Sequence, residues 1–282
     1  MNSNPNPRVN ANTNRPAVLS YLLVAAAALL VSASFSAAAQ PAQPADPSAW
    51  QGAVGGGVVS SPAYPGSASA KTEFVPLLLL TKGALFIGGM PGTGVPLGVG
   101  YTFYQTPQIR LGAAVGGGLS KLRKEADFTR LSGLGDINNT VRGSIFGSYN
   151  TALFGLRGNI ATDLGGNKLG TLVSVDADAR GKLTDQLSVS AGPGLTWANG
   201  TYSQTVFGIN AAQSAASQRP AYSAKSGVNS VRFTVGADYS IDTRWGVRAF
   251  VTTARLQGDA ANSPITEKRS QNSAGAFVSY RF

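Results

Sequence analysis

The end of the chain constrains the fold more than any other stretch of the sequence. From Asn272 to Phe282 the residues alternate between an apolar and a mostly polar set, which is the period of a β-strand. The apolar face would hold Ala274, Ala276, Val278, Tyr280 and Phe282, and Phe277 is the one misfit on the other face. A terminal aromatic with a second aromatic two residues earlier is typical of outer-membrane β-barrels, where these rings lie in the interfacial girdle. An edge strand of a soluble β-sandwich is the alternative.

The N-terminus predicts export. Arg8 and Arg15 lie in a polar segment without acidic residues, and an apolar run follows over 17–31. The run is shorter than the ~20 residues that a membrane-spanning helix needs, and it leads to small residues at 37–39 that fit a cleavage site. We therefore predict a signal peptide over 1–39, cleaved near Ala39, a flexible periplasmic lead over 40–49, and an outer-membrane barrel over 50–282.

The composition excludes several classes of function. The chain has no Cys and no His, so the usual soft and imidazole metal ligands are missing. Ser-His-Asp and Cys-His catalysis are excluded for the same reason. We therefore expect no metal, no cofactor and no enzymatic activity, although a Ser-Lys dyad or the carboxylate pair Asp176 and Asp178 remains open.

The charge indicates which partners to expect. Charged residues make up 13% of the chain, with a formal net charge of +10. A soluble domain of this size carries about 25% charged residues, so the low value favours a barrel whose outside faces lipid. An exported basic protein meets lipopolysaccharide phosphates, peptidoglycan or anionic solutes, and we expect no nucleic-acid partner.

Alternating segments of about ten residues recur from Trp50 onward and predict an all-β fold. We expect an antiparallel transmembrane β-barrel of about twelve strands, with ten or fourteen as alternatives. The stretch Tyr202–Ile209 also resembles a strand, and we place it in a long extracellular loop to keep the number even. The expected strands are 50–60, 72–81, 84–89, 95–105, 108–119, 140–149, 152–163, 169–183, 186–198, 227–241, 244–256 and 272–282.

The charged residues of these strands fall on the face opposite to the apolar one and would point into the barrel. The predicted lumen-facing residues are Arg110, Arg142, Arg157, Arg180, Lys182, Arg232, Arg248, Arg281, Asp163, Asp176, Asp178 and Asp238. Arginine facing lipid would cost ~2–4 kcal/mol at the bilayer midplane, which supports this assignment. The set would either line a water-filled pore that favours anions or pair across the lumen and fill it.

Four stretches outside the alternation have the composition of compact loops. Loop geometry without any ligand chemistry is a sufficient explanation for each of them. They contain Tyr64, Gly66 and Ser67; Gly133, Leu134, Gly135 and Asp136; Tyr202, Phe207 and Gly208; and Asp259, Ser263, Pro264 and Ile265. Together and in this order, with Tyr280 and Phe282 at the end, they resemble the MipA/OmpV family (MltA-interacting protein) of outer-membrane proteins over nearly the whole mature chain.

The resemblance implies an outer-membrane barrel and, for some members, a scaffold between a peptidoglycan lytic transglycosylase and a synthase. Other members resemble adhesion or permeability proteins. Our leading hypothesis is a non-enzymatic scaffold, and a small anion-preferring channel with an Arg-lined lumen is the alternative. A barrel-borne enzyme and a soluble periplasmic module are further alternatives. The expected partners are outer-membrane lipid and lipopolysaccharide, a murein lytic transglycosylase and synthase, and the barrel-assembly machinery through Tyr280 and Phe282.

Overall fold

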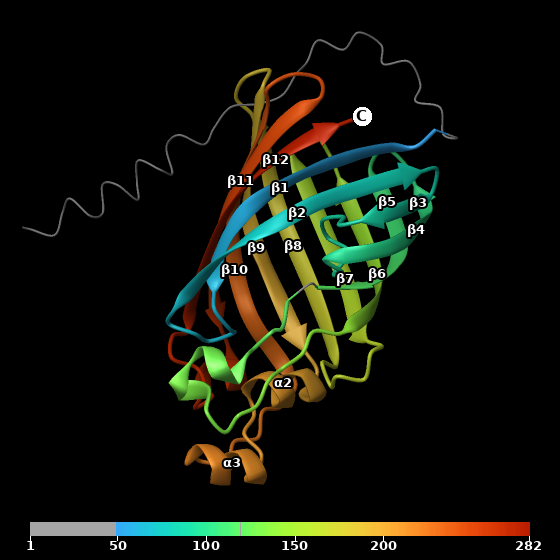
Figure 1. Cartoon of the computed structure of the whole chain (residues 1–282). Helices are drawn as coiled ribbons and strands as arrows, with labels where there is room; N and C mark the ends of the chain where they lie inside the picture. Colours follow the sequence, from blue (N-terminus) through green and yellow to red (C-terminus); the bar gives the residue numbers. More distant parts are fainter. Residues whose placement is uncertain (1–48, 119) are drawn as a thin grey trace, which may run out of the picture. The chain divides into compact units, whose positions relative to one another are not determined.

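The chain forms a closed barrel of antiparallel strands (Figure 1). The computed structural model describes residues 49–118 and 120–282, so the predicted signal peptide and residues 40–48 of the predicted lead lie outside the described residues. Each of the twelve strands pairs with its neighbours in sequence, and β1 pairs with β12. The prediction of an all-β antiparallel barrel with twelve strands is therefore confirmed.

The strand boundaries agree with the alternation in the sequence to within a few residues. The strands are β1 (Gln51–Pro62), β2 (Ala70–Lys82), β3 (Leu85–Gly88), β4 (Leu97–Gln105), β5 (Ile109–Gly117), β6 (Val141–Asn150), β7 (Phe154–Asp163), β8 (Thr171–Lys182), β9 (Leu187–Ala198), β10 (Gly227–Ser240), β11 (Trp245–Leu256) and β12 (Ser270–Arg281). The barrel closes on the last residue, because Phe282 and Gly52 exchange backbone hydrogen bonds of 3.0 and 3.1 Å.

The outside of the barrel is apolar and exposed, which is the reverse of a soluble protein. On β10 the residues Val231 and Phe233 are exposed while Arg232 between them turns inward and is half-buried. Ile145 and Val251 on other strands are 63% and 59% exposed. Side chains alternate across a strand, so one apolar face per strand produces one continuous apolar belt around the ring. This belt is the surface of a membrane-spanning barrel.

Aromatic side chains gather at the end of the barrel where the chain terminates. The rings of Trp245 and Tyr280 meet edge to face at 5.1 Å, and Phe282, two residues after Tyr280, is exposed. Amphipathic rings of this kind mark the depth of the membrane–water interface. Among the described residues, no helix combines the length and the hydropathy that crossing a membrane would require.

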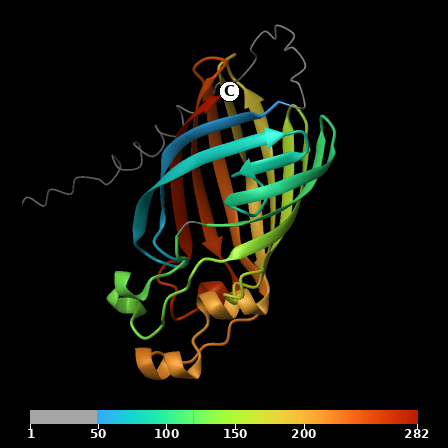
Figure 2. The ribbon, with the colours of Figure 1, turned by 45° about the vertical axis from the view of Figure 1, so that its right-hand side comes forward.

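The two ends of the barrel differ in the length of their connections. Turns of two to four residues join β2–β3, β4–β5, β6–β7, β8–β9 and β10–β11 at the end that carries both termini of the barrel. The other end carries the longer loops, with the 3-10 helices η1 (Glu125–Asp127) and η2 (Thr129–Leu131) and the helices α2 (Gly200–Phe207), α3 (Ala211–Ser217) and α4 (Gly258–Asn262). Figure 2 shows η1, η2, α2 and α3 gathered at this long-loop end.

One element differs from the sequence prediction. The stretch Tyr202–Ile209 is not strand-like, because most of it forms helix α2. The side chain of Asn199 accepts a hydrogen bond from the backbone N–H of Tyr202 and so caps the helix. Its buried residues are Ser203, Val206 and Phe207, which lie at the i, i+3 and i+4 spacing of one helical face. The apolar residues of this stretch are compatible with the period of a strand and with that of a helix, and the helix N-cap at Asn199 decides for the helix.

The apolar belt gives a prediction for Val251, which lies in the middle of β11 between the outward Val235 and Ala274 of its neighbours. Val251→Arg should lower the free energy of unfolding in phospholipid vesicles by about 2–4 kcal/mol, because the guanidinium would enter hydrocarbon at midplane depth. A denaturant titration measures this change. The control Val141→Arg, at the start of β6 near the interface, should cost only about 0–1 kcal/mol. Equal effects would contradict the assignment of the belt.

Candidate functional site

The four loop motifs of the sequence meet at the long-loop end. We call the loops at this end, residues 63–69, 120–140, 164–170, 199–226 and 257–269, the cap. One apolar cluster in the cap joins side chains from four of its loops, and its buried members are Tyr64, Leu131, Leu134, Ile209 and Ile265. Leu131 is fully buried and Tyr64 is 3% exposed. The motifs therefore form a small hydrophobic core, although they lie far apart in the sequence.

A second apolar cluster of the cap lies against the ends of the strands. Its buried members are Ile137, Leu169, Val206, Phe207, Ala224, Leu256 and Ala260. The loop after β5 supplies Ile137, and the loop after β11 supplies Ala260. These two loops start half a circumference apart in a ring of twelve strands, so their contact shows that packed side chains bridge this end of the barrel.

Arg123 connects three carbonyl groups of the cap. It is 3% exposed, and its guanidinium donates hydrogen bonds to the carbonyls of Leu134, Gly135 and Val206 at 3.2–3.4 Å. Burial lowers the pKa of Arg123, while nearby groups such as Glu125 oppose the shift. A buried guanidinium needs its acceptors, and here the acceptors come from the loops after β5 and β9.

Further hydrogen bonds join the motifs to one another and to other residues of the cap. The Ser263 hydroxyl donates to the carbonyl of Phe207 at 2.6 Å, and the Asp259 carboxylate accepts from the N–H of Lys225 at 2.8 Å. The carbonyl of Gly66 accepts from the N–H groups of Glu267 and Lys268. These contacts give each motif a structural role in holding the cap together.

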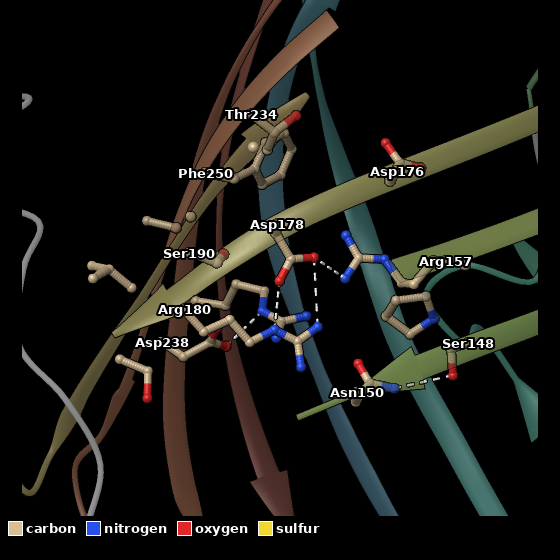
Figure 3. A pocket seen from close by; sticks show the side chains of 18 of the residues that line it. Ser148, Asn150, Arg157, Asp176, Asp178, Arg180, Ser190, Thr234, Asp238 and Phe250 are labelled. Atoms are coloured by element: carbon tan, nitrogen blue, oxygen red, sulfur yellow. Dashed lines mark hydrogen bonds and ion pairs between the residues drawn. The ribbon is translucent and has the colours of Figure 1, made fainter. Parts of the chain in front are cut away.

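The inside of the barrel holds a cavity of about 1490 Å³. Its lining comes from the inner faces of the strands, from residues of the β3–β4 connection, and from the short turns, among them Asp185 and Asp242. Because turn residues line it and no cap residue does, the cavity lies toward the short-turn end of the barrel. Figure 3 shows Arg157, Asp178 and Arg180 pointing into it from neighbouring strands.

Ion pairs occupy part of the cavity wall. Asp178, with a side chain 7% exposed, binds both Arg157 and Arg180 at 2.5 Å. Asp176 accepts two hydrogen bonds of 2.8 Å from Arg232, and Asp238 binds Arg248 at 2.6 Å. Both members of the carboxylate pair considered for catalysis are thus bound to arginine.

The structure separates the predicted lumen residues into two groups. Nine line the cavity: Arg110, Arg157, Asp176, Asp178, Arg180, Lys182, Asp238, Arg248 and Arg281. Arg232 lies beside them through its pair with Asp176. Among the strand residues that face the cavity, cations outnumber carboxylates by seven to three when Arg232 is included.

Arg142 and Asp163 were also predicted to face the lumen, but they do not line this cavity. Arg142 is buried under the cap, where it donates to the carbonyl of Leu169 at 3.3 Å and lies 6.0 Å from the ring of Tyr202. The Asp163 carboxylate accepts hydrogen bonds from backbone N–H groups of the β7–β8 turn, including that of Leu169 at 2.8 Å. Both residues point inward in the alternation, but they sit at strand ends where the loops fold over them.

Two features of the cavity escaped the sequence analysis. The β3–β4 connection, 89–96, folds inward, where the carbonyl of Gly92 accepts from Asn159 at 3.2 Å and Arg110 contacts the Met90 sulfur at 3.6 Å. The misfit Phe277 stacks on Phe250 inside the barrel, with ring centroids 6.5 Å apart. The sequence did contain a signal for this stack, because Phe250 and Phe277 both fall on the otherwise polar face of two adjacent strands.

The two pairs made by Asp178 and Asp238 offer a matched comparison. Asp178→Asn should lower the free energy of unfolding by about 1–3 kcal/mol, because two guanidiniums would lose a buried counter-charge. Asp238→Asn should cost about 0–1 kcal/mol, because that pair is 42–53% exposed. Denaturant unfolding of both variants in vesicles measures the difference. A larger cost for Asp238→Asn would contradict the burial of the Asp178 pair.

Among the residues that the structure describes, no group of three or more His, Cys, Asp or Glu side chains is placed to hold a metal ion.

Comparison with known proteins gives a family and a set of distant barrels. The model of the family "MltA-interacting protein MipA" matches residues 54–282. The channel DcaP of Acinetobacter baumannii is similar at 10% identity, with 83% of this chain and 96% of that chain covered and a TM-score of 0.38. OprB of Pseudomonas putida (8%, 83% and 94%, 0.42) and an anion-selective porin from Comamonas acidovorans (8%, 83% and 99%, 0.38) are similar to a like degree.

These structural likenesses are too weak to support an inference about function, and no curated protein matches the chain. The family match does not depend on these structural likenesses. It covers most of the described chain, including all four loop motifs and the C-terminal strand. The chain belongs to the MipA family of MltA-interacting proteins and has the architecture of an outer-membrane β-barrel.

Proposed function

We propose that this protein is a non-enzymatic barrel of the outer membrane that binds a peptidoglycan-processing enzyme at its periplasmic end. The cap is the observation that carries the proposal. It packs two apolar clusters at the long-loop end, and no cap residue lines the cavity below it. Such a barrel anchors and presents a surface, whereas an open porin needs a continuous path for solutes.

The family description supplies the chemical class of the partner. The matching model describes a protein that interacts with MltA, and the sequence resemblance implies a murein lytic transglycosylase and a synthase. Short turns of outer-membrane barrels lie on the periplasmic side, so the short-turn end would face these enzymes. This end exposes apolar side chains, among them Leu153 and Leu183, which are 61% and 49% exposed. We also propose that the barrel-assembly machinery recognises the C-terminal strand, with Tyr280 and Phe282.

Binding of purified lytic transglycosylase to the barrel in lipid nanodiscs tests the docking proposal. Surface plasmon resonance should detect saturable binding to the native protein. Leu153→Asp combined with Leu183→Asp should weaken it at least tenfold, because charge would replace apolar contact area at the short-turn end. Ala212→Asp on α3, at the other end, is the control and should leave binding unchanged. Absence of saturable binding to the native barrel would refute the proposal.

A small anion-preferring channel is the second candidate, and the excess of cations along the cavity favours it. The side chain of Arg281 lines the cavity without an ion pair to any carboxylate of the described chain. In this candidate the cap would have to open before solutes could pass.

Conductance across planar lipid bilayers distinguishes the two candidates. The native barrel should be silent, because the cap closes one end. Arg123→Met should produce anion-selective openings, because three carbonyls would lose their buried donor and the loops would separate. Arg130→Met is the control, since its pair with Glu267 is partly exposed and contributes little. Steady anion-selective current through the native protein would establish the channel instead.

A further inference from the structure

The cavity has two chemically different walls. Arg110, Arg157, Arg180 and Lys182 line it from β5, β7 and β8. Phe250 and Phe277 line it from β11 and β12, the strands that also carry Arg248 and Arg281. The register places Arg180 and Phe250 in one row around the barrel, with Ser190 and Gly236 between them. Because both intervening residues are small, the space between the cation and the ring stays open. Figure 3 shows Arg180, Ser190 and Phe250 around this space.

On the cationic wall, Asp178 holds two guanidiniums in place as a fork. Arg157 uses Nη1 and Arg180 uses Nε toward the same carboxylate, which lies buried beneath them. The two arginine side chains are about one third exposed, at 32% and 31%. Each guanidinium has five N–H donors, so donors remain that can face the cavity. Gly155 permits this arrangement, since a Cβ there would collide with the Arg180 guanidinium.

The aromatic wall forms a flat shelf. The rings of Phe250 and Phe277 are nearly parallel, at 16°, and both are half-buried. Glycines back them, because a Cβ at Gly275 would meet the ring of Phe250 and a Cβ at Gly57 would meet that of Phe277. The backbone of these two glycines lies behind the rings, and both phenylalanines line the cavity.

Together these walls define a ligand with two features. A planar carboxylate matches the guanidinium fork, which can bind it through parallel hydrogen bonds. A ring with an apolar face matches the aromatic shelf, and hydroxyl groups find partners in Ser148, Ser190 and Thr234 of the same lining. The volume of about 1490 Å³ exceeds the ~300–1,000 Å³ of ordinary small-molecule sites, so more than one ring fits.

We propose that the cavity is a binding site for a saccharide that carries a carboxylate, reached from the short-turn end. Because the cavity lies toward the short-turn end, the ligand enters and leaves from that side. The site is separate from the docking surface proposed above and needs no enzyme. The two carboxylates of the rim, Asp185 and Asp242, lie in turns, and the ligand binds beyond them at the fork.

Titration calorimetry on the mature barrel in detergent tests this site with N-acetylmuramic acid as the probe. N-acetylglucosamine lacks the lactyl ether and with it the carboxylate, and lactate lacks the ring. We expect saturable binding of the sugar acid, and at least tenfold weaker binding of either part alone. Equal binding of lactate or of inorganic phosphate would show a general anion site and overturn the saccharide assignment. No binding of the sugar acid would overturn the proposal altogether.

Variants assign the two walls. Arg157→Gln and Arg180→Gln should each weaken binding of the sugar acid at least tenfold. Phe277→Leu should weaken the sugar acid but leave the weak binding of lactate unchanged. Arg255→Gln, an outward arginine on β11, is the matched control and should have no effect. Circular dichroism establishes that each variant is folded. Unchanged binding by the folded Arg157→Gln and Arg180→Gln proteins would place the ligand elsewhere and overturn the site.

Discussion

Closure of the β-sheet is the constraint on which the rest of this structure depends. A backbone N–H or C=O group without a partner costs several kcal/mol in hydrocarbon, so a sheet can cross a membrane only as a ring without edges. Here the ring closes where β1 meets β12, and its last hydrogen bonds join Gly52 to Phe282. The C-terminal residue is therefore part of the closure as well as part of the aromatic girdle.

A closed ring also decides where the apolar core can lie. The apolar faces of the strands are turned to lipid, and the inner faces carry charged and polar groups. Of the three apolar clusters in the described residues, one lies inside the barrel around Phe86 and Phe146, and the other two lie in the cap. Loop residues that would be solvated in most proteins are consequently the most deeply buried ones here, such as Leu131 and Phe207.

The closed ring also decides where the charged side chains lie. Arginine is costly on the lipid face at midplane depth, so the strand arginines other than Arg255 point inward, and Asp176, Asp178 and Asp238 each hold at least one arginine. With Asp185 and Asp242 of the turns included, five carboxylates stand against seven cations, so the cavity keeps an excess of positive charge on the strands that face the Phe250–Phe277 pair across Ser190 and Gly236. The barrel therefore has two different ends. The long-loop end is packed with the apolar side chains of the cap, and the short-turn end leads to the cationic wall of the cavity.

The sequence by itself determined the class of fold, the approximate strand boundaries and the inward phase of the charges, because a strand's two-residue period is a local property. Only the structure fixed the number of strands at twelve among the alternatives of ten and fourteen. It also showed the loop motifs as motifs. It did not show that Tyr64, Leu134, Ile209 and Ile265 share one core, nor that Arg142 and Asp163 lie outside the cavity, because these facts depend on loops meeting from opposite sides of the ring. The helix α2 depends on a single cap, Asn199, and on packing of one face. Only the tertiary structure decided which arginines form ion pairs and which face open space. These pairs join different strands, and the two-residue period of a strand does not give its register against its neighbours.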